Sequence, residues 1–475
     1  MIKKGDIIDL DIKDFAFGGK GIGKIKLDDK DYIIFVQHAI SGQFVKVKIT
    51  KKKPKYAEGI IQEVLKRSNL ERISKYQTIS GAPYINLPID EQKKMKLAVT
   101  KNIFEKIGKL NNVDEYFDEW IPSPSSFHYR NKMEYSFSSI GYDFNNEEVV
   151  DDTFSLGFKR KGTWWIVENL NNDSGLFDQE LEINLFKIRD FLQQTGLPAW
   201  HPPKKVGFFR HLVVRKSYSN NKILMNLVTS SNNIGKFNIE QFANFLSQLF
   251  KERLAGLIHT INDDVADREK LDKGNSKLIF GEKTIFEKIN NLDFEISMQS
   301  FFQTNPKCAE KLYQKVIDYL LEYKIDKDQI ILDLFCGTGT IGQLISKHTT
   351  NNIIGVDIVE SSVKNAIKNA KINQLSRLKF INSDVGKFLL THPEYQNKIH
   401  SIVIDPPRAG ISPKSLRKVI RLNAKVIIYV SCNPATQARD LVTLNEMGYE
   451  LKKFSLVDQF PHTAHIESIM LFEKN

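Results

Sequence analysis

Cys432 is the residue whose surroundings most favour chemistry. It follows an apolar strand expected at 425–430 and comes directly before Asn433 and Pro434. Asparagine is a preferred helix N-cap and proline a preferred first helical residue, so a helix is expected to begin here. The positive end of a helix dipole favours a thiolate and is expected to lower the pKa of Cys432. The pattern therefore predicts a nucleophilic cysteine.

A glycine-rich loop joins an expected strand, 330–335, to the helix that follows it. Its glycines are Gly337, Gly339 and Gly342. They allow a ligand to approach the backbone closely, and their spacing fits NAD as well as S-adenosylmethionine. Asp333 in the strand would repel a pyrophosphate but could hold the cationic amino-acid part of S-adenosylmethionine. Asp357 and Asp384 end the next two strands, from which they could reach ribose hydroxyls and the adenine amine. Each acid could be a helix cap or loop carboxylate, but three at successive strand ends favour a cofactor site.

Two further acids are expected near Cys432. Asp405 ends a strand at 401–404 and is followed by two prolines, which stiffen the loop at the carboxyl edge of the sheet, where ligands bind. Asp-Pro-Pro can be a simple sharp turn, but after the fourth strand of a methyltransferase sheet it is typical of nucleic-acid base modification. Glu467 opens the last strand and lies near the same edge if the strand order is the usual one. By itself it would be interpreted as a surface acid.

The elements that must position these residues indicate three regions. Residues 1–65 contain short strands with glycine punctuation, which predicts a small OB-like barrel that binds nucleic acid or acts as a spacer. Residues 66–295 form a mixed α+β region, with a helical segment near 88–120 that is expected to pack on the catalytic domain. From 296 to 475 strands alternate with helices, which predicts a doubly wound, Rossmann-like α/β sheet.

Composition narrows the class of protein. The chain has 475 residues and a net charge of +11, with a pI of about 9.1, which is compatible with a polyanionic partner. Six lysines fall between 46 and 55 without an acid, Lys51, Lys52 and Lys53 among them, although such a run can be a solvated turn. The three cysteines suggest neither a disulfide framework nor a metal site. Without a signal peptide or membrane anchor, this predicts a cytoplasmic protein, most simply a monomer.

Six blocks in order resemble the RNA (uracil-5-)-methyltransferase family, which makes 5-methyluridine in 23S ribosomal RNA and transfer RNA. Residues 1–65 resemble the TRAM barrel of its ribosomal RNA members. The blocks are Tyr129–Glu134, Ser300–Asn305, Asp333–Gly342, Asp405–Arg408, Ser431–Pro434 and Phe460–Glu467. Together they cover almost the whole chain, which makes a chance resemblance negligible.

The resemblance implies a role for each residue. S-adenosylmethionine would be the methyl donor, Cys432 the nucleophile that adds to carbon 6 of uracil, and Glu467 the base that removes the proton from carbon 5. The positions that correspond to cofactor contacts are Gln303, Phe335, Asp357 and Asp405, and Asp405 would also lie close to the uracil. Phe301 would stack near the target, and Arg130 and Arg408 would lie on the RNA side. The target base would be flipped into the pocket, while the barrel and its lysines hold the flanking RNA.

The sequence departs from the family at one site. Many members bind a [4Fe–4S] cluster through four cysteines, whose positions here hold Ser74, Ser80, Pro83 and a residue near Asn172. Because thiolates hold such clusters, we expect no iron–sulfur cluster. We therefore expect packing alone to hold the central domain together.

Three alternatives remain open. The barrel favours 23S ribosomal RNA as the substrate, but the same chemistry on transfer RNA is possible. A non-catalytic RNA-binding protein that kept the fold is a second alternative, which the intact set of Cys432, Glu467 and Asp405 disfavours. Cytosine-5 methylation uses the same thiol logic, but the Ser431–Pro434 block and the terminal glutamate fit the uracil enzymes better.

Overall fold

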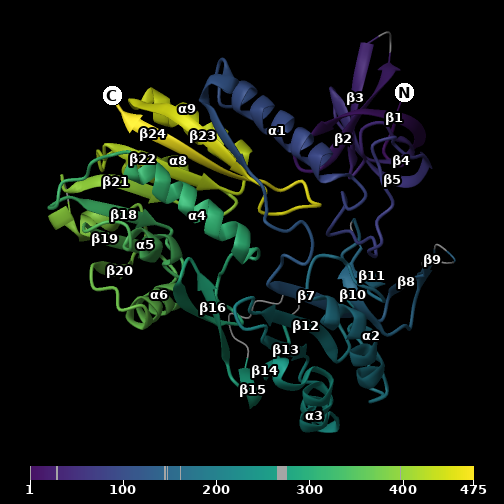
Figure 1. Ribbon diagram of the computed structural model, residues 1–475. Helices are drawn as coiled ribbons and strands as arrows, with labels where there is room; N and C mark the ends of the chain where they lie inside the picture. The colour runs from purple at the N-terminus through teal and green to yellow at the C-terminus, as the bar shows by residue number, and fades with distance from the viewer. Residues whose placement is uncertain are drawn as a thin grey trace. The chain divides into compact units, whose positions relative to one another are not determined.

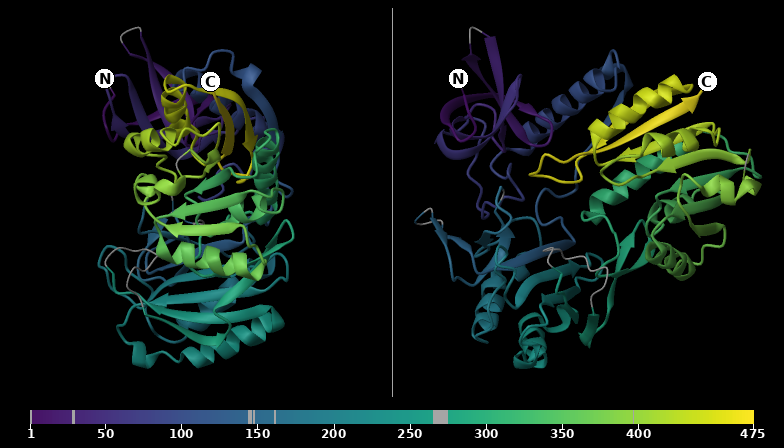
Figure 2. Two further views of the ribbon diagram at one scale, coloured as in Figure 1. Left: turned by 90° about the vertical axis from the view of Figure 1, so that its left-hand side faces the viewer. Right: turned by 180° about the vertical axis from the view of Figure 1, so that it is seen from behind.

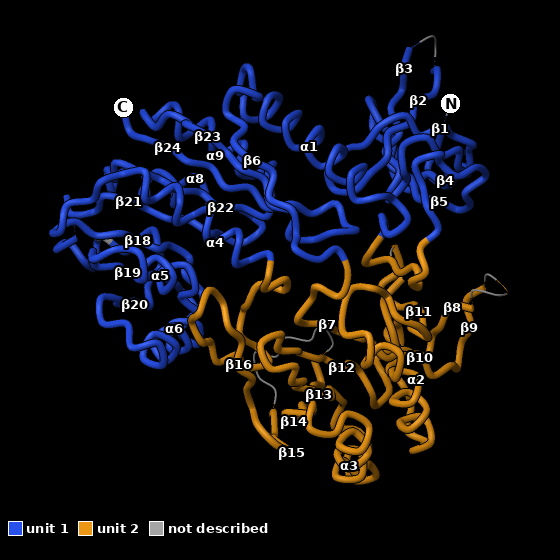
Figure 3. Tube along the Cα trace, in the orientation of Figure 1, with its two compact units in different colours: residues 1–73, 83–126, 308–475 blue, residues 74–82, 127–307 orange. Residues whose placement is uncertain are grey.

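The computed structural model divides the chain into two compact units (Figure 3). It describes residues 2–27, 30–143, 146, 148–160, 162–264, 275–395 and 397–475. Unit 1 comprises Met1–Ile73, Pro83–Ser126 and Cys308–Asn475, and unit 2 comprises Ser74–Ala82 and Phe127–Lys307. The expected three-domain division with borders at 65 and 295 stays a prediction.

The N-terminal part of unit 1 is a closed barrel with strand order β1-β2-β3-β5-β4. The strands are β1 (Ile7–Ala16), β2 (Lys20–Leu27), β3 (Lys30–Gln37), β4 (Phe44–Lys52) and β5 (Tyr56–Lys66). Alternate residues such as Leu10, Ile34 and Val45 fill the interior. Gly59 is required for closure, because a Cβ atom there would lie 2.3 Å from a methyl carbon of Val47. The predicted OB-like barrel is confirmed.

The C-terminal part of unit 1 is a doubly wound sheet with strand order β20-β19-β18-β21-β22-β24-β23-β6 (Figure 1). Its strands are β6 (Phe117–Ile121), β18 (Ile330–Leu334), β19 (Asn352–Asp357), β20 (Leu378–Asn382), β21 (Ile399–Ile404), β22 (Val426–Ser431), β23 (Tyr449–Val457) and β24 (Glu467–Lys474). Neighbouring strands from β20 to β22 are parallel, whereas β24 is antiparallel to β22 and β23. The parallel strands therefore present their carboxyl ends at one edge, as predicted.

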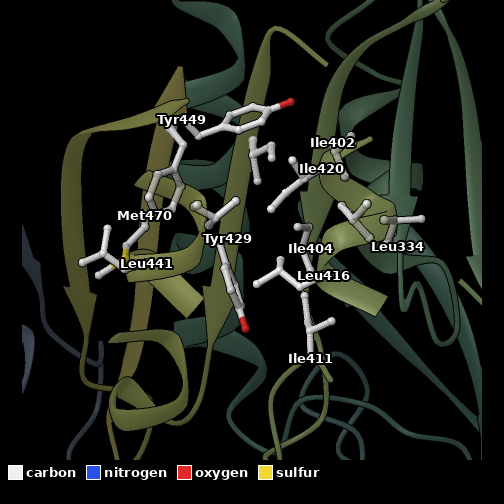
Figure 4. Packing of buried hydrophobic residues seen from close by; sticks show 14 of the residues in the cluster. Leu334, Ile402, Ile404, Ile411, Leu416, Ile420, Tyr429, Leu441, Tyr449 and Met470 are labelled. Carbon is white, nitrogen blue, oxygen red and sulfur yellow. The ribbon is translucent and has the colours of Figure 1, made fainter. Parts of the chain in front are cut away.

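Helices cover both faces of this sheet. They are α1 (Ile89–Lys106), α4 (Pro306–Leu321), α5 (Thr340–Ile345), α6 (Glu360–Ile372), α7 (Phe388–Thr391), α8 (Pro413–Ile420) and α9 (Pro434–Glu446). On one face, Leu416 of α8 and Leu441 of α9 pack with Leu334, Ile404 and Tyr429 of the strands (Figure 4). Phe104 of α1 belongs to the same core. Figure 2 shows these helices from two further sides. None of the described helices is long and apolar enough to cross a membrane.

Unit 2 is built on a mixed sheet with strand order β15-β14-β13-β12-β7-β10-β11-β8-β9, together with the hairpin β16-β17. The strands are β7 (Lys132–Ser138), β8 (Gly141–Asp143), β9 (Glu148–Val150), β10 (Ser155–Lys159), β11 (Val167–Asn169), β12 (Phe209–Lys216), β13 (Ile223–Thr229), β14 (Leu254–Ile261), β15 (Asn275–Gly281), β16 (Thr284–Ile289) and β17 (Leu292–Ser297). The helices α2 (Gln179–Gln193) and α3 (Ile239–Phe250) are amphipathic and begin at side-chain N-caps, Asp178 and Asn238. This region matches the predicted α+β class.

A polar crossing in unit 2 corrects the expectation that packing alone holds this region. The Gln77 side chain donates to the carbonyl of Asn169 at 2.7 Å and accepts from the backbone N–H groups of Asn171 and Asn172 at 2.9 and 3.0 Å. Its backbone N–H donates to the carbonyl of Asp173 at 2.9 Å. Three side-chain hydrogen bonds of one amide, which we name the Gln77 crossing, therefore join the two segments in which the family resemblance places the cysteine positions. The absence of a cluster stays a prediction.

Candidate active site

Cys432 and Glu467 lie opposite each other at the end of two neighbouring strands. Ser431 of β22 pairs with Ser468 of β24 at the end of their antiparallel ladder. Cys432 follows Ser431 and Glu467 precedes Ser468, so the continued register sets the two side chains across from each other. Directly opposed residues of such a pair have Cβ atoms about 5 Å apart. The register alone thus brings a thiol beside a carboxyl group.

The side chains at the carboxyl edge point to one face of the sheet. Side chains alternate between the two faces along a strand. In each strand, one set of alternate residues packs into the core under α8 and α9; this set includes Leu332, Leu334, Ile404 and Tyr429. The site residues occupy the other set of alternate positions, and they are Asp333, Asp357, Asp405, Cys432 and Glu467. They therefore point to the other face, which α4 crosses (Figure 1).

Tyr313 of α4 agrees with this placement. It is buried, and the carboxyl groups of Asp405, Glu467 and Asp333 add to burial in raising its pKa well above the usual value. Because such an influence weakens with distance, the Tyr313 ring lies near acids from three different strands. The motifs did not point to Tyr313. The signal that could have found it is its position, with Leu312, on the buried side of an amphipathic helix.

The environment of Cys432 overturns the expectation of a lowered pKa. The predicted helix start is confirmed, since α9 begins at Pro434 and the Asn433 side chain accepts from the N–H of Ala435. Burial, together with the carboxyl groups of Glu467 and Asp405, nevertheless raises the pKa of Cys432 to about 11. The loss of water on burial and the two nearby acids outweigh the positive charge of Arg408. In the free protein the thiol is neutral at physiological pH.

The two acids beside Cys432 retain protons more strongly than ordinary carboxyl groups. Glu467 is 3% exposed, and burial followed by the charge of Asp405 raises its pKa well above the usual value. Burial raises the pKa of Asp405 to about 7. A pKa near 7 is typical of a group that exchanges protons near neutral pH, and a carboxyl group with a raised pKa is a stronger base than an ordinary one. The edge therefore holds a thiol and two carboxyl groups suited to proton transfer.

Asp333 occupies an environment that is costly for a carboxylate. It is fully buried, and burial raises its pKa to about 8. Its Oδ2 atom accepts from the N–H of Gly342 at 2.9 Å, while Oδ1 has no hydrogen-bond partner among the described residues. A buried acceptor without a donor is destabilising unless a ligand provides one. Asp333 is thus available to a donor group that the described residues do not supply.

The glycine loop after β18 is tightly packed. Gly339 has φ of +73°, and a Cβ atom there would lie 2.5 Å from the ring of Phe380. The N–H of Gly337 donates to Oδ2 of Asp357 at 2.9 Å, and Oδ1 of Asp357 accepts from the N–H of Val359 at 2.8 Å. Asp357 is therefore fixed at the end of β19 beside the loop, as the cofactor prediction requires.

Two other predicted cofactor residues flank this loop. Phe335 adopts φ of +61°, which is uncommon for a residue other than glycine and occurs often at functional sites. It packs against the core from the end of β18. Asp384 follows β20 and remains half-buried, and its backbone carbonyl accepts from the N–H of Lys387 at 2.8 Å. Both residues thus lie at strand ends that border the edge.

Arg408 supplies positive charge beside the catalytic candidates. Its carbonyl accepts from the Asn433 side chain at 3.0 Å, and its Nη2 atom lies 3.0 Å from Nδ1 of His465. The guanidinium opposes the raised pKa of both Cys432 and Glu467. Exposed and near this site, it can contact a polyanion.

The lysine run of the barrel is partly neutralised. Lys46 pairs with Glu63 at 2.6 Å, and Lys51 pairs with Glu58 at 3.1 Å, so acids of β5 face the run across the sheet. Lys52 and Lys53 are exposed. The sequence window contained no acid because its partners lie on the neighbouring strand. Exposed pairs of this kind are weak and leave their charges accessible.

Comparisons with known proteins decide the family. Residues 273–475 match the model of the tRNA (uracil-5-)-methyltransferase family, and residues 3–61 match that of the TRAM domain. Proteins of Clostridium tetani and Caldanaerobacter subterraneus, each described as an uncharacterized RNA methyltransferase, are similar over their whole length. They are 33% and 34% identical, over 99% of this chain and over 98% and 100% of the relatives. The chain belongs to the RNA (uracil-5-)-methyltransferase family.

A solved structure shares the fold of this methyltransferase. The tRNA (uracil-54, C5)-methyltransferase of Pyrococcus abyssi, solved in complex with S-adenosyl-L-homocysteine, has a TM-score of 0.68 at 24% identity. The match covers 98% of this chain and all of that one. The family resemblance and the fold class expected from the six sequence blocks are therefore confirmed.

Three predicted site residues of the methyltransferase belong to unit 2. Phe301 is 64% exposed, which leaves its ring accessible. The backbone carbonyl of Gln303 accepts from the Asn131 side chain at 3.0 Å, which fixes this block within unit 2. The backbone N–H of Arg130 donates to the carbonyl of Leu176 at 3.0 Å. The roles of these three residues stay predictions.

Proposed function

We propose that this protein transfers a methyl group from S-adenosylmethionine to carbon 5 of a uridine in 23S ribosomal RNA through a covalent bond between Cys432 and carbon 6. The observation that carries the proposal is the placement of Cys432 opposite Glu467, with Asp405 nearby, at the carboxyl edge of a methyltransferase sheet. A thiol and two titratable carboxyl groups are the set that addition to uracil and proton removal need.

The residues at the edge fit the cofactor. The unpaired, buried Oδ1 of Asp333 suits the ammonium group of its amino-acid part, and the close packing of Gly339 allows a ligand to contact the backbone. Asp357 would accept from ribose hydroxyls, and Asp384 from the adenine amine. Phe335 and Gln303 complete the proposed set. The bound cofactor supplies an electrophilic methyl group on a positively charged sulfur.

Cys432 acts first in the proposed mechanism. Its thiol passes a proton to Asp405, whose pKa of about 7 allows it to hold one near neutral pH. The freed electron pair on Sγ forms a bond to carbon 6 of uracil, and the electrons of the carbon 5–carbon 6 double bond move toward the carbonyl at carbon 4. Carbon 5 thereby becomes nucleophilic and would take the methyl group as the methyl–sulfur bond breaks, which leaves a neutral thioether, S-adenosylhomocysteine.

Glu467 acts next. Its ionised carboxylate removes the remaining proton from carbon 5, the double bond forms again, and Cys432 leaves as a thiolate that regains its proton from Asp405. The carboxylic acid so formed on Glu467 then releases this proton to solvent. Burial raises the pKa of Glu467, which makes it a stronger base than an exposed glutamate. The net change replaces one proton of carbon 5 by a methyl group.

The RNA must present an unstacked uridine to this edge. The base would be flipped out of its helix, because the ring carbons are inaccessible within a stack. Arg408 lies beside Cys432, where its charge suits a flanking phosphate, and Lys51, Lys52 and Lys53 offer further charge on the barrel. By the family resemblance, Phe301 would stack near the target uridine and Arg130 would lie on the RNA side.

The choice between RNA substrates rests on the barrel. Residues 3–61 match the TRAM domain, and the resemblance of residues 1–65 to the barrel of the ribosomal RNA members supports ribosomal RNA. Transfer RNA is the second candidate, because the matched family is that of tRNA (uracil-5-)-methyltransferases and the Pyrococcus abyssi transfer RNA enzyme matches 98% of this chain, the barrel region included. Both candidates require the same chemistry at Cys432.

The test is methylation of purified large-subunit ribosomal RNA and of transfer RNA, each from cells that lack 5-methyluridine. The assay uses methyl-labelled S-adenosylmethionine and maps the labelled nucleotide. We expect 5-methyluridine in the ribosomal RNA. Label in transfer RNA alone would overturn the substrate and keep the chemistry. No label in either RNA would favour a non-catalytic RNA-binding protein.

A further inference from the structure

The loop Asp458–Ile466 joins β23 to β24 and leads directly into Glu467. The last pair of the ladder joins Val457 to Glu467, so the residues between them are held by other contacts. His462 adopts φ of +64°, an uncommon conformation that persists where surrounding contacts hold it. The contacts that fix this loop therefore bear on where the Glu467 carboxyl group lies.

Lys96 of α1 forms a buried ion pair with this loop. Its Nζ atom donates to Asp458 at 2.6 Å and to the carbonyl of Phe460 at 3.0 Å. The side chains of Lys96 and Asp458 are only 1% and 3% exposed. Burial lowers the pKa of Lys96, and the charge of Asp458 opposes this change. An apolar pair of similar volume would often be as stable, so the buried charges suggest specificity of geometry.

Gln92, one helical turn before Lys96, holds the centre of the same loop. It is fully buried, and its Oε1 atom accepts from the N–H of His462 at 2.7 Å. Its Nε2 atom donates to the carbonyl of Leu87 at 2.6 Å and lies 3.1 Å from Nδ1 of His462. Spacing of four residues puts Gln92 and Lys96 on one side of α1. The two side chains thus hold the loop at Asp458, Phe460 and His462, and we name this set of contacts the grip.

The helix that presents these residues is itself fixed to the catalytic sheet. Ile103 and Phe104, near the end of α1, belong to the core that contains Met470 of β24. The ring of Phe104 contacts that of Phe454 on β23 at a centroid distance of 5.0 Å. One end of α1 is therefore anchored to the strands on both sides of the loop, while its other half holds the loop.

We propose that Gln92 and Lys96 are positioning residues that hold the loop Asp458–Ile466 so that Glu467 can remove the proton from carbon 5. The inference rests on the proposed function, in which Glu467 is the base. Cys432 is held by a different element, because β22 and the N-terminus of α9 fix it. Loss of the grip should therefore slow proton removal and release, but not addition of the thiol or methyl transfer.

The test measures these steps separately with methyl-labelled S-adenosylmethionine and a mixture of unmodified ribosomal and transfer RNA transcripts. The variants are K96M and Q92M, and the control is K94M, which replaces an exposed lysine of the same helix. The double variant K96M/D458N removes both buried charges and serves where K96M alone loses its thermal unfolding transition. Each protein is assayed for labelled protein–RNA adduct that survives denaturation and for the rate of product release.

We expect the three grip variants to accumulate methyl-labelled adduct and to release product on the order of 100-fold more slowly, the cost of a misplaced catalytic group. Their rate of adduct formation should stay within about twofold of the parent, and K94M should behave as the parent does. A parallel fall of both rates without adduct in folded variants would overturn the proposal, and so would unchanged release. Should E467Q trap no adduct while C432A stays active, the proposed covalent mechanism would fail instead.

Discussion

The carboxyl edge of the methyltransferase sheet and the Gln77 crossing of unit 2 treat polar groups in opposite ways. At the edge, Asp333 is buried with an oxygen that has no partner among the described residues, and burial raises the pKa of Glu467. At the crossing, both ends of the Gln77 side chain are paired with backbone groups. Unpaired buried carboxyl groups cost stability, whereas paired amides contribute to it.

This difference separates regions that bind ligands or exchange protons from regions that only hold the fold together. Groups that must bind a ligand or exchange a proton cannot be fully paired within the free protein, so the edge retains a stability cost. The crossing has no such demand and joins distant segments with hydrogen bonds. Substitutions at the edge should change activity with little loss of stability, and those at the crossing should do the reverse.

The largest effect is expected for C432A. Loss of the thiol removes the atom that would bond to carbon 6, so methylation should fall on the order of 10⁴-fold or more. The side chain is small and half-buried, so the midpoint of urea unfolding should change little. Initial rates with labelled cofactor measure the first quantity. Retention of more than about a tenth of the activity would contradict a covalent mechanism.

E467Q should nearly abolish turnover and leave a chemical trace that C432A lacks. The amide cannot accept the proton from carbon 5, so the methylated base should stay bonded to Cys432. The measurement is a denaturing gel of protein incubated with RNA, in which a slower band carries the methyl label. If E467Q is inactive but gives no such band, Glu467 is not the base and instead supports folding or binding.

A smaller effect concerns the reactivity of Cys432 in the free protein. Since burial and nearby acids raise its pKa to about 11, the thiolate fraction and the rate of alkylation should climb about tenfold per pH unit between pH 7 and 10. The E467Q substitution removes one of those acids and should lower the pKa of Cys432. At every pH in this range where Glu467 is ionised in the parent, Cys432 of the variant should therefore be alkylated faster.

Mass spectrometry after iodoacetamide treatment reports the modified cysteine. Cys308 and Cys336 are buried and should stay unmodified, which makes them internal controls. If the alkylation rate of Cys432 is already maximal at pH 7 and does not rise further with pH, the pKa of this thiol is low. The helix terminus would then dominate its pKa, as the sequence pattern alone predicted.

The same comparison explains what the sequence could predict. The placement of Asp333, Asp357 and Asp405 could be predicted, because each lies within one residue of the end of a short apolar strand, and parallel strands end at one edge. The helix start after Cys432 could be predicted because Asn-Pro is a local sequence signal for it. The raised pKa of Cys432 could not be predicted, because it depends on burial in the folded protein and on the charge of Glu467, which the pairing of β22 with β24 brings beside it.

Contacts between segments far apart in the chain could not be predicted from the sequence either, because they too depend on the tertiary fold. Gln77 and Asn169 are 92 positions apart, and Lys96 and Asp458 are 362 apart. No spacing or periodicity relates such residues, and a glutamine or lysine in these segments would ordinarily be taken as a surface residue. β6 likewise joins the catalytic sheet beside β23 from an earlier part of the chain. A helical segment expected near 88–120 gave no indication of that strand.

The smallest effect, and the one that tests the crossing, is that of Q77A. It removes three side-chain hydrogen bonds, each worth about 1 kcal/mol net, so the free energy of unfolding should fall by about 2–3 kcal/mol. Q193A replaces an exposed glutamine of the same unit and should change that energy by less than about 0.5 kcal/mol. Urea unfolding measures both, and methylation by Q77A at 25 °C should equal that of the parent. Equal stability of the two variants would show that packing alone holds the segment, and loss of methylation in folded Q77A would break the separation between the holding and acting regions.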